Sequence, residues 1–337
     1  MSSPGPLISV LLPVRDVALT LEACLASLRR QTVDDWECVL IDDGSGDATG
    51  ELARRAACDD ARIRVHTIEA TGLVGALNIG LDAARGRFIA RMDGDDVMHR
   101  DRLASQVALL DAERALAAVG CHVRLFPRAG LREGRRAYER WLNAIDSPAR
   151  VRAEAFVECP IAHPSLMVRG DVLRACRYRD RGWPEDYDLV LRLLGAGREI
   201  GVVPRRLLLW RDRPTRLSRT SPVYGLDRFT ACKAAFLAAG FLASDAGYVL
   251  CGYGATGKAL FRALAAHGKR PTHIVELHPG RLGKIIHGAR VVPPPALAEI
   301  PRQPIVVSVA HVEPRTEARA TLRAMGFIEG RDFVCAA

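Results

Sequence analysis

The first hundred residues alternate between short apolar runs and segments whose apolar residues recur at helical spacing. This alternation is typical of a mainly parallel sheet with helices on both faces, where ligands bind beyond the carboxyl ends of the strands. We predict strands at 8–13, 37–41, 63–67 and 87–92, and helices at 18–30, from about 46 to 57, and at 75–84.

The pattern is less regular after residue 100 and starts again near the C-terminus. We predict a helix and a strand within 103–123, a loop at 124–136, a helix at 187–195 and a strand at 206–211. An apolar helix at 228–239 precedes a second alternating pattern that begins at Tyr248. We therefore predict a first α/β domain at 1–220, a helical connector at 221–245, and a small Rossmann-like α/β domain at 246–337.

Composition narrows the class of protein. The chain has 337 residues, enough for two domains, and its 49% hydrophobic and 26% charged residues are ordinary for a globular protein. A net charge of +9 suits an acidic partner, but the basic residues are scattered and mostly Arg. We therefore favour a solvated Arg-rich surface and expect no nucleic-acid partner.

The cysteines and the apolar segments indicate the cellular compartment in which we expect the protein. The nine cysteines lack paired spacing, so neither a zinc site nor a disulfide framework is indicated. No apolar run reaches the roughly 18 residues of a membrane span, and the short polar leader is unlike a signal peptide. We expect a soluble, cytoplasmic protein with at most peripheral membrane association.

A run of acids directly follows the fourth predicted strand. Asp93, Asp95 and Asp96 place three carboxylates within four residues, which would repel strongly if buried without a counter-charge. A divalent cation such as Mg²⁺ takes carboxylate oxygens and keeps positions for substrate phosphates. The alternative is a solvated acidic turn, which the preceding apolar strand disfavours.

Two further acidic segments stand at predicted element ends. Asp42 and Asp43 follow the second strand, where a carboxylate can accept hydrogen bonds from a base N–H or a ribose hydroxyl; a turn or helix cap is the alternative. Glu185, Asp186 and Asp188 open an apolar helix. Such acids complement the helix dipole, or one of them deprotonates an acceptor hydroxyl.

The order of these motifs resembles the family 2 inverting glycosyltransferases of GT-A fold. Each motif is weak alone, but five occur in the family's order over roughly residues 7–220. The matching segments are Leu12–Asp16, Asp42–Ser45, Gly72–Gly80, Arg91–Asp96 and Glu185-Asp186.

The resemblance implies a hexosyltransferase-type enzyme and assigns roles to individual residues. A nucleoside-diphosphate sugar, with UDP favoured, would be the donor, and a saccharide or lipid-linked hydroxyl in cell-surface glycan assembly the acceptor. Asp186 would be the general base, and Mn²⁺ or Mg²⁺ the cofactor. Pro13, Val14, Arg15 and Asp16 would line the nucleotide pocket, Asp43 with Asp42 would read the base, and Asp93 and Asp95 would hold ribose and metal, with Asp95 the favoured metal ligand.

Some positions depart from the family or leave two interpretations open. Arg15-Asp16 stands where the family has an aromatic residue and Asn, and the absence of a Gln-x-x-Arg-Trp segment argues against a processive synthase. Glu185 and His163 are placed on the acceptor side, although His163 is equally a structural histidine. Arg211 either reaches the diphosphate or is a surface arginine.

The C-terminal pattern contains a glycine fingerprint. Gly252, Gly254 and Gly257 follow an expected strand and open a helix, where backbone N–H groups favour phosphate, and Glu276 ends the next strand. The region resembles small Rossmann-like modules of sugar acyltransferases and sugar methyltransferases. We expect it to bind a phosphorylated ligand or to mediate assembly, and a homo-oligomer is one form that such assembly would take. We do not expect it to be required for sugar transfer.

Three other functions remain as alternatives. A sugar nucleotidyltransferase would need a Gly-rich, Arg-containing loop after the first strand, and Pro13-Val14-Arg15-Asp16 is not such a loop. A non-catalytic nucleotide-sugar-binding or scaffolding protein would not need the acids at 93, 95 and 186. A nicotinamide-dependent dehydrogenase rests on the C-terminal glycines alone.

Overall fold

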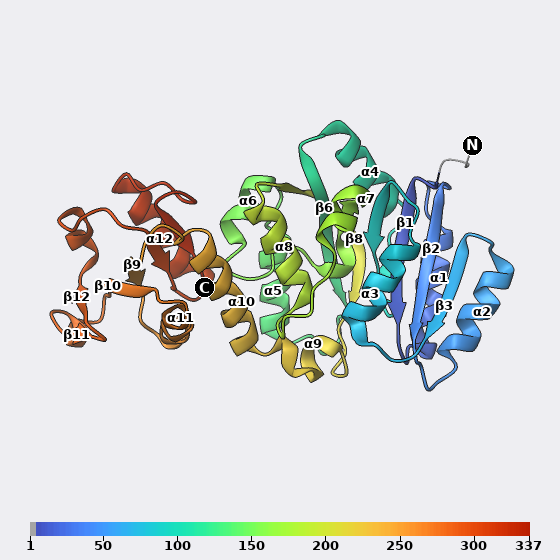
Figure 1. Ribbon diagram of the computed structural model, residues 1–337, viewed down its shortest axis with the longest axis horizontal. Coiled ribbons are helices and arrows are strands. Elements are labelled where there is room, and N and C mark those ends of the chain that lie inside the picture. Colours follow the sequence, from blue (N-terminus) through green and yellow to red (C-terminus); the bar gives the residue numbers. More distant parts are fainter. Residues whose placement is uncertain (1–4) are drawn as a thin grey trace. The chain divides into compact units, whose positions relative to one another are not determined.

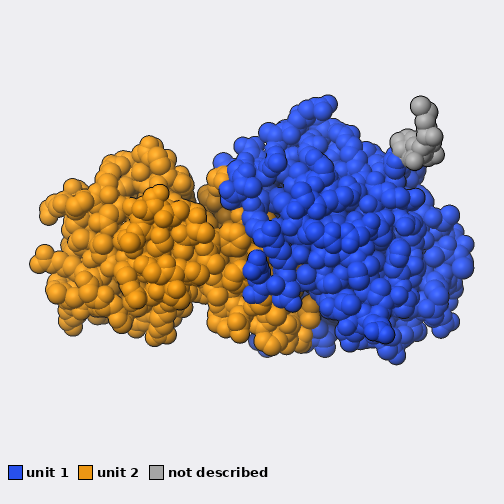
Figure 2. Space-filling model, in the orientation of Figure 1, with its two compact units in different colours: residues 1–151, 161–181, 192–216 blue, residues 152–160, 182–191, 217–337 orange. Residues whose placement is uncertain are grey.

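A computed structural model describes residues 5–337; the first four residues of the polar leader lie outside this range. The chain forms two compact units (Figure 2). Unit 1 contains the described residues through 151, together with 161–181 and 192–216. Unit 2 contains 152–160, 182–191 and 217–337. The chain therefore passes between the units several times.

Unit 1 is built on an eight-stranded sheet of order β3-β2-β1-β4-β7-β6-β8-β5 (Figure 1). The first four strands of the chain are parallel, β7 is antiparallel to β4 and β6, and β8 is parallel to β6 but antiparallel to β5. The strands are β1 (Ile8–Val14), β2 (Trp36–Asp43), β3 (Ile63–Ile68), β4 (Phe88–Arg91), β5 (Val97–Met98), β6 (Leu116–Phe126), β7 (Met167–Arg169) and β8 (Glu199–Arg211).

Helices connect these strands. Helices α1, α2 and α3 are the crossovers between the first four parallel strands, and α6 and α8 each contribute residues to both units. The elements are α1 (Ala18–Arg29), α2 (Thr49–Asp59), α3 (Gly72–Ala83), α4 (Arg102–Ala112), α5 (Glu133–Leu142), α6 (Pro148–Glu154), the 3₁₀ turn η1 (His163–Ser165), α7 (Gly170–Cys176) and α8 (Glu185–Gly195).

The first strands are continuous apolar runs because both of their faces are covered. Every residue of β1, β2 and β4 is buried, as expected for parallel strands between two layers of helices. Close packing also explains Gly80 in α3, where a Cβ would lie 2.3 Å from the Leu11 side chain. The strand–helix alternation predicted for the first hundred residues is thus confirmed, with boundaries shifted by a few residues.

Two local predictions for unit 1 were wrong. The segment 124–136 is not one loop, because β6 continues to Phe126 and α5 begins at Glu133. Strand β8 begins at Glu199 rather than at Arg206. In both places charged residues on an exposed strand face or helix surface looked like loop composition.

Unit 2 has its own six-stranded sheet, of order β11-β12-β10-β9-β13-β14. All adjacent strands are parallel except the β11–β12 pair. Its elements are α9 (Leu217–Thr220), η2 (Pro222–Tyr224), α10 (Leu226–Ala239), β9 (Gly247–Cys251), α11 (Ala255–Ala266), β10 (Arg270–Val275), η3 (Pro279–Arg281), β11 (Ile285–Ile286), β12 (Ala289–Val292), η4 (Pro294–Ala298), β13 (Ile305–Val307), α12 (Val312–Ala324) and β14 (Phe333–Cys335).

Residues 152–160 are integral to unit 2. Phe156 and Val157 pack against its apolar clusters, and the buried Glu154 carboxylate lies 2.6 Å from an Arg319 nitrogen in α12. The Lys233 ammonium in α10 donates hydrogen bonds to the carbonyls of Val157 and Ala336. Burial lowers the pKa of Lys233 to about 8.

The helices were also considered as candidate membrane spans. Between residues 5 and 337, none combines the length and the apolar character needed to cross a bilayer.

Candidate donor and metal site

The candidate site lies where the parallel strands of unit 1 end. Strands β1 and β2 pair in parallel, with Val14 opposite Asp42, and β4 pairs with the other side of β1. Their carboxyl ends therefore bring the loops after Val14, Asp43 and Arg91 to one edge of the sheet. This is the edge at which ligands bind in open α/β sheets.

The loop after β1 is held by the loop after β2. The Asp16 N–H donates to the Ser45 hydroxyl, and an Asp16 carboxylate oxygen accepts from Gly46 N–H at 2.8 Å. The Val17 N–H donates to the hydroxyl of Thr49. Asp16 adopts a positive φ of 51°, which Asp tolerates better than most residues. The predicted pocket residues Pro13 to Asp16 thus end a strand and start an ordered turn.

Asp42 and Asp43 are buried at the end of β2 and bond to backbone groups. One Asp43 oxygen accepts from Thr71 N–H at 2.7 Å, and the other accepts from Gly72 N–H at 3.0 Å. These bonds satisfy free donors at the start of α3. Asp42 accepts from Ser45 N–H at 3.2 Å. Asp43 also lies 4.0 Å from the Arg15 guanidinium. Both acids therefore stabilise the local backbone. Their role in binding the nucleotide base stays a prediction.

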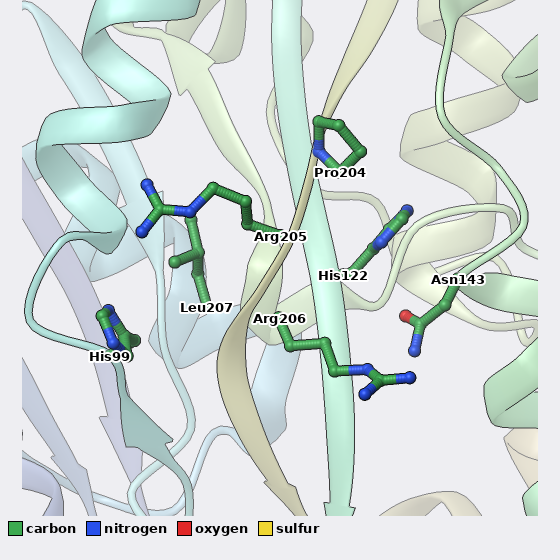
Figure 3. Close-up of a pocket in the computed structure, with 7 residues that line it drawn as sticks. All are labelled: His99, His122, Asn143, Pro204, Arg205, Arg206 and Leu207. Carbon is green, nitrogen blue, oxygen red and sulfur yellow. The ribbon is translucent and has the colours of Figure 1, made fainter.

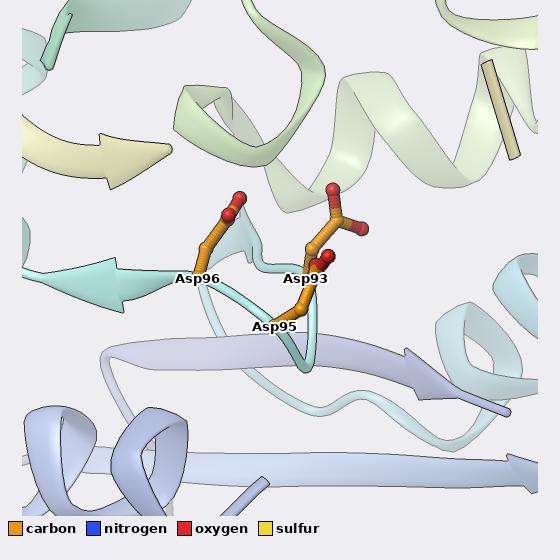
Figure 4. A group of neighbouring side chains, drawn as sticks. All are labelled: Asp93, Asp95 and Asp96. Atoms are coloured by element: carbon orange, nitrogen blue, oxygen red, sulfur yellow. The ribbon is translucent and has the colours of Figure 1, made fainter. Parts of the chain in front are cut away.

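Asp93, Asp95 and Asp96 form a compact group on the turn after β4 (Figure 4). Each offers a carboxylate oxygen, and these oxygens all lie within 4.8 Å of one another. Oδ1 of Asp96 accepts from Arg211 N–H at 2.7 Å, whereas its buried Oδ2 has no hydrogen-bond partner among the described residues. An oxygen without a partner beside two further carboxylates fits a hard divalent cation.

The three acids have different electrostatic surroundings. Burial alone would raise the pKa of Asp93, but Arg91, Arg216 and His163 hold it below its usual range. Burial and the charge of Asp93 raise the pKa of Asp95 despite the nearby Arg213. Burial, with the charges of the other two acids, raises the pKa of Asp96 well above its usual range. The group therefore favours a positive charge in its centre.

Arginines at the end of β8 and directly after it lie beside this acidic group. Arg211 donates from Nε to the Asp95 carbonyl at 2.7 Å, and its guanidinium lies over the Phe126 ring. Arg213 Nε lies 3.0 Å from an Asp95 carboxylate oxygen. Arg216 donates to the Arg211 carbonyl. The structure thus places Arg211 beside the acidic group, together with two arginines that the sequence analysis did not identify.

Buried groups beneath the turn fix its position. Arg91 Nη2 lies 2.6 Å from an Asp93 oxygen, and the fully buried Arg102 donates to the Arg91 carbonyl at 2.8 Å. Arg102 also bonds Gln106, whose amide donates to the Ser165 carbonyl. Sequence reasoning missed this network because residues bonded to each other in it lie up to 59 positions apart.

His163 lies in unit 1 and is buried. Its Nε2 is 3.2 Å from the Tyr178 hydroxyl, and the residue contributes to the lowered pKa of Asp93. Tyr178 is in turn fixed by Asn78 of α3, whose amide bonds both its N–H and its carbonyl. Asn78 belongs to the Gly72–Gly80 motif, so this motif also positions the His163 surroundings.

Glu185 and Asp186 are the first two residues of α8 and belong to unit 2. The Glu185 carboxylate accepts from the Tyr224 hydroxyl at 2.6 Å. Asp188, two positions later, accepts from the Trp183 indole, so it has a structural role. The assignment of Asp186 as general base and of Glu185 to the acceptor side stays a prediction.

The predicted glycine turn lies between β9 and α11. Gly252 has a φ of 90°, Gly254 precedes the first residue of α11, and a Cβ on Gly257 would lie 2.4 Å from the Gly252 carbonyl. Glu276 directly follows β10 and pairs with Arg281 at 2.8 Å. Phosphate binding at these glycines stays a prediction.

Comparison with known sequences defines the class of this protein. The sequence model described as "Glycosyl transferase family 2" matches residues 9–175. The Bacillus subtilis protein named "Putative glycosyltransferase EpsE" is 30% identical over 239 residues, which cover 68% of this chain and 83% of EpsE. The chain therefore belongs to glycosyl transferase family 2.

Other relatives match over shorter stretches. "Uncharacterized glycosyltransferase EpsJ" of B. subtilis is 46% identical over 91 residues, which cover 27% of this chain and 26% of EpsJ. Among solved structures, Staphylococcus aureus TarS residues 1–349 with UDP gives a TM-score of 0.54 at 17% identity, covering 77% of this chain and 71% of that one. This likeness shows that the fold is that of GT-A glycosyltransferases.

Proposed function

We propose that this protein transfers a sugar from a nucleoside-diphosphate sugar to a hydroxyl group, with inversion at the anomeric carbon. The observation that carries the proposal is the group of Asp93, Asp95 and Asp96 at the carboxyl edge of the sheet, bordered by Arg211 and Arg213. Carboxylates for a cation and guanidinium groups for phosphate oxygens suit a diphosphate leaving group.

The three aspartates are the residues that would hold the cation. A divalent cation such as Mn²⁺ or Mg²⁺ supplies positive charge that neutralises the departing diphosphate. Arg211 and Arg213 supplement this charge, and the pocket formed by Pro13 to Asp16 with Asp42 and Asp43 holds the nucleoside. Asp93 accepts a ribose hydroxyl, and Arg91 fixes its carboxylate.

The chemical step is a single in-line displacement. The acceptor oxygen forms a bond to the anomeric carbon while the bond from that carbon to the diphosphate oxygen breaks. Asp186 takes the proton of the attacking hydroxyl, and the bonding electrons leave with the nucleoside diphosphate. Glu185 and His163 line the acceptor side.

UDP-sugars are the first donors to test, because the TarS structures of the same fold are described with UDP and with UDP-GlcNAc. We propose cell-surface glycan assembly in the cytoplasm as the setting, with a saccharide or lipid-linked acceptor. Residues 246–337 form a Rossmann-like module that binds a ligand or mediates assembly. If it binds a phosphorylated ligand, the Gly252–Gly257 turn contacts the phosphate.

Calorimetric titration with UDP-GlcNAc, with and without Mn²⁺, tests the proposed donor site. The wild-type chain should bind the donor only when the cation is present, and Asp95→Asn should abolish this metal-dependent binding. The variant should stay folded, because the change relieves repulsion within the acidic group. Asp111→Asn, an exposed acid of α4, is the matched control and should bind like wild type. Equal affinity of Asp95→Asn and wild type would exclude the metal role, and a wider screen for released nucleoside diphosphate would identify the donor.

A further inference from the structure

A cavity opens in unit 1 where β8 departs from regular pairing with β6. Its volume is about 500 Å³, within the range of small-molecule sites. The cavity is lined by His99, His122, Asn143 and residues 204–207 (Figure 3). None of these residues belongs to the donor and metal site described above.

A bulge in β8 creates the cavity. Cys121 pairs with Val203, but the next residue of β6, His122, pairs with Arg206, so Pro204 and Arg205 have no partner on β6. Bulges of this kind redirect side chains and are frequent next to functional sites. Here the bulge exposes three consecutive residues of a strand that is otherwise largely buried.

The bulge turns two neighbouring arginines in different directions. Arg205 lies 3.2 Å from an Asp101 oxygen and is thereby paired. Arg206 is exposed, and no carboxylate within residues 5–337 pairs with it. Figure 3 shows Arg206 on the same side of β8 as His122 and Asn143. The His122 ring is fixed by a contact of 3.0 Å from Nε2 to the Ile145 carbonyl. The cavity therefore offers one uncompensated guanidinium beside a fixed imidazole.

Further arginines lie on the same face of the sheet between this cavity and the donor site. His122 pairs with Arg206, Arg124 with Leu209, and Phe126 with Arg211, so these side chains share one face of the sheet. Arg124 is exposed and, in the described part of the chain, has no carboxylate partner. Arg211 lies beside Asp95. Their partners on β6, His122 and Phe126, are four residue steps apart, which corresponds to about 13 Å at the usual rise.

We propose that this cavity binds a negatively charged group, a carboxylate or a phosphate, on the acceptor glycan several sugar units from the reacting hydroxyl. The inference rests on the proposed transferase function. Arg206 holds the anion, because a guanidinium forms two parallel hydrogen bonds to carboxylate or phosphate. Arg124 attracts the intervening part of the chain, and a neutral glycan gains nothing from either arginine.

Binding of defined oligosaccharides tests the proposal. Tetragalacturonic acid supplies carboxylates, a phosphorylated maltotetraose supplies phosphate, and unmodified maltotetraose is the neutral probe. Each is titrated calorimetrically into the full chain with saturating UDP and Mn²⁺, so that the donor site is occupied. We expect at least one acidic probe to bind tenfold or more tightly than the neutral one, and added salt to weaken it. The tighter acidic probe identifies the group recognised.

Three variants locate the site. Arg206→Gln should weaken the acidic probe at least fivefold, and Arg124→Gln should weaken it less. Arg114→Gln removes the same charge from the exposed turn between α4 and β6 and should bind like wild type. Equal losses in Arg206→Gln and Arg114→Gln, or no preference of wild type for either acidic probe, would overturn the proposal. Failure of UDP to bind in the same titrations would count against the donor site instead.

Discussion

At the scale of single residues, Asp186 is the acid on which the proposed chemistry depends. Asp186→Asn keeps the size of the side chain but removes the proton acceptor. We expect turnover to fall at least about a hundredfold, the usual cost of losing a general base, with donor affinity nearly unchanged. Steady-state rates and donor titration on the same preparation measure both. Asp227→Asn, an exposed acid of α10, is the control. A parallel loss of donor binding would reassign Asp186 to ligand positioning.

Glu37 gives a prediction that depends on pH. This buried carboxylate accepts hydrogen bonds from Ser9 and Arg85 and pairs with Arg64. Although burial opposes ionisation, these partners lower the pKa of Glu37 from 4.5 to about 2. Its charge therefore stabilises the fold fully above about pH 4.5, and this contribution disappears as the pH falls toward 2.

The variant Glu37→Gln isolates this contribution. Urea unfolding should show the variant less stable than wild type by about 3 kcal/mol at pH 6, because each pKa unit corresponds to roughly 1.4 kcal/mol. The difference should shrink steadily below pH 4. Glu22→Gln, whose ion pair is exposed, should show little difference at any pH. A gap that stays constant from pH 6 to pH 2.5 would contradict the argument.

The sequence revealed the acids of the site and Arg211, but not Arg213 or Arg216. Asp42, Asp43, Asp93 and Asp95 stand out because carboxylates directly after apolar strands are conspicuous. Arg213 is separated from Asp95 by 118 residues, and a scattered arginine carries no signal of its own among 48 basic residues. The ion pair of Arg91 with Asp93 depends on the conformation of the turn after β4, which the sequence pattern does not predict.

At the scale of elements, Gly86 fixes the approach of the α3–β4 loop to β1. A Cβ at this position would lie 2.3 Å from the Ser9 nitrogen, and the Gly86 N–H donates to the Ser9 hydroxyl at 2.7 Å. Gly86→Ala should therefore cost more than about 2 kcal/mol, because backbone must move.

A second glycine provides the control. A Cβ on Gly134 in α5 would have no neighbouring atom within 4 Å, and Ala is the better helix former by about 1 kcal/mol. Gly134→Ala should raise the unfolding temperature while Gly86→Ala lowers it, as measured by thermal melting. Similar shifts in both variants would mean that close packing at Gly86 is relieved cheaply.

Element types were predictable in the parallel half of unit 1 because buried strands and amphipathic helices have distinct patterns. Strand β8 was underestimated because Pro204, Arg205 and Arg206 interrupt its apolar run. Pro204 and Arg205 form the bulge, so the prediction failed at the point where β8 departs from regular pairing. The short strands β11 and β14 have only two and three residues, too few for any periodicity.

At the scale of the whole molecule, the pair of Arg319 and Glu154 ties residues far apart in sequence into unit 2. Glu154 is 2% exposed and also lies 3.9 Å from Arg315, so removing Arg319 takes away its shortest ion pair in a poorly solvated place. Arg319→Met should cost roughly 3 kcal/mol. Scanning calorimetry should show this loss as a shifted transition. Arg331→Met removes an exposed pair with Asp332 and should change stability by under about 1 kcal/mol. Equal shifts in the two variants would show that Glu154 is solvated after all.

The division of the chain into 1–220, 221–245 and 246–337 reflects where sequence patterns change. The compact units have different boundaries, since residues 152–160 and 182–191 belong to unit 2. Sequence periodicity cannot show this, because it reports local structure and not the distant partner of an apolar side chain. A truncation near Ala243 would also expose Phe156 and Val157, so its activity tests stability as well as the predicted division of labour.

The interrupted course of unit 2 has a consequence for synthesis on the ribosome. Glu154 is made 165 residues before Arg319. At translation rates of roughly 5–20 residues per second, that interval lasts about 8–33 seconds. Throughout it, Phe156, Val157 and the Glu154 carboxylate wait without the strands and helix that will enclose them. We therefore expect apolar side chains in the middle of the nascent chain to stay exposed during this interval, and to be a binding site for chaperones.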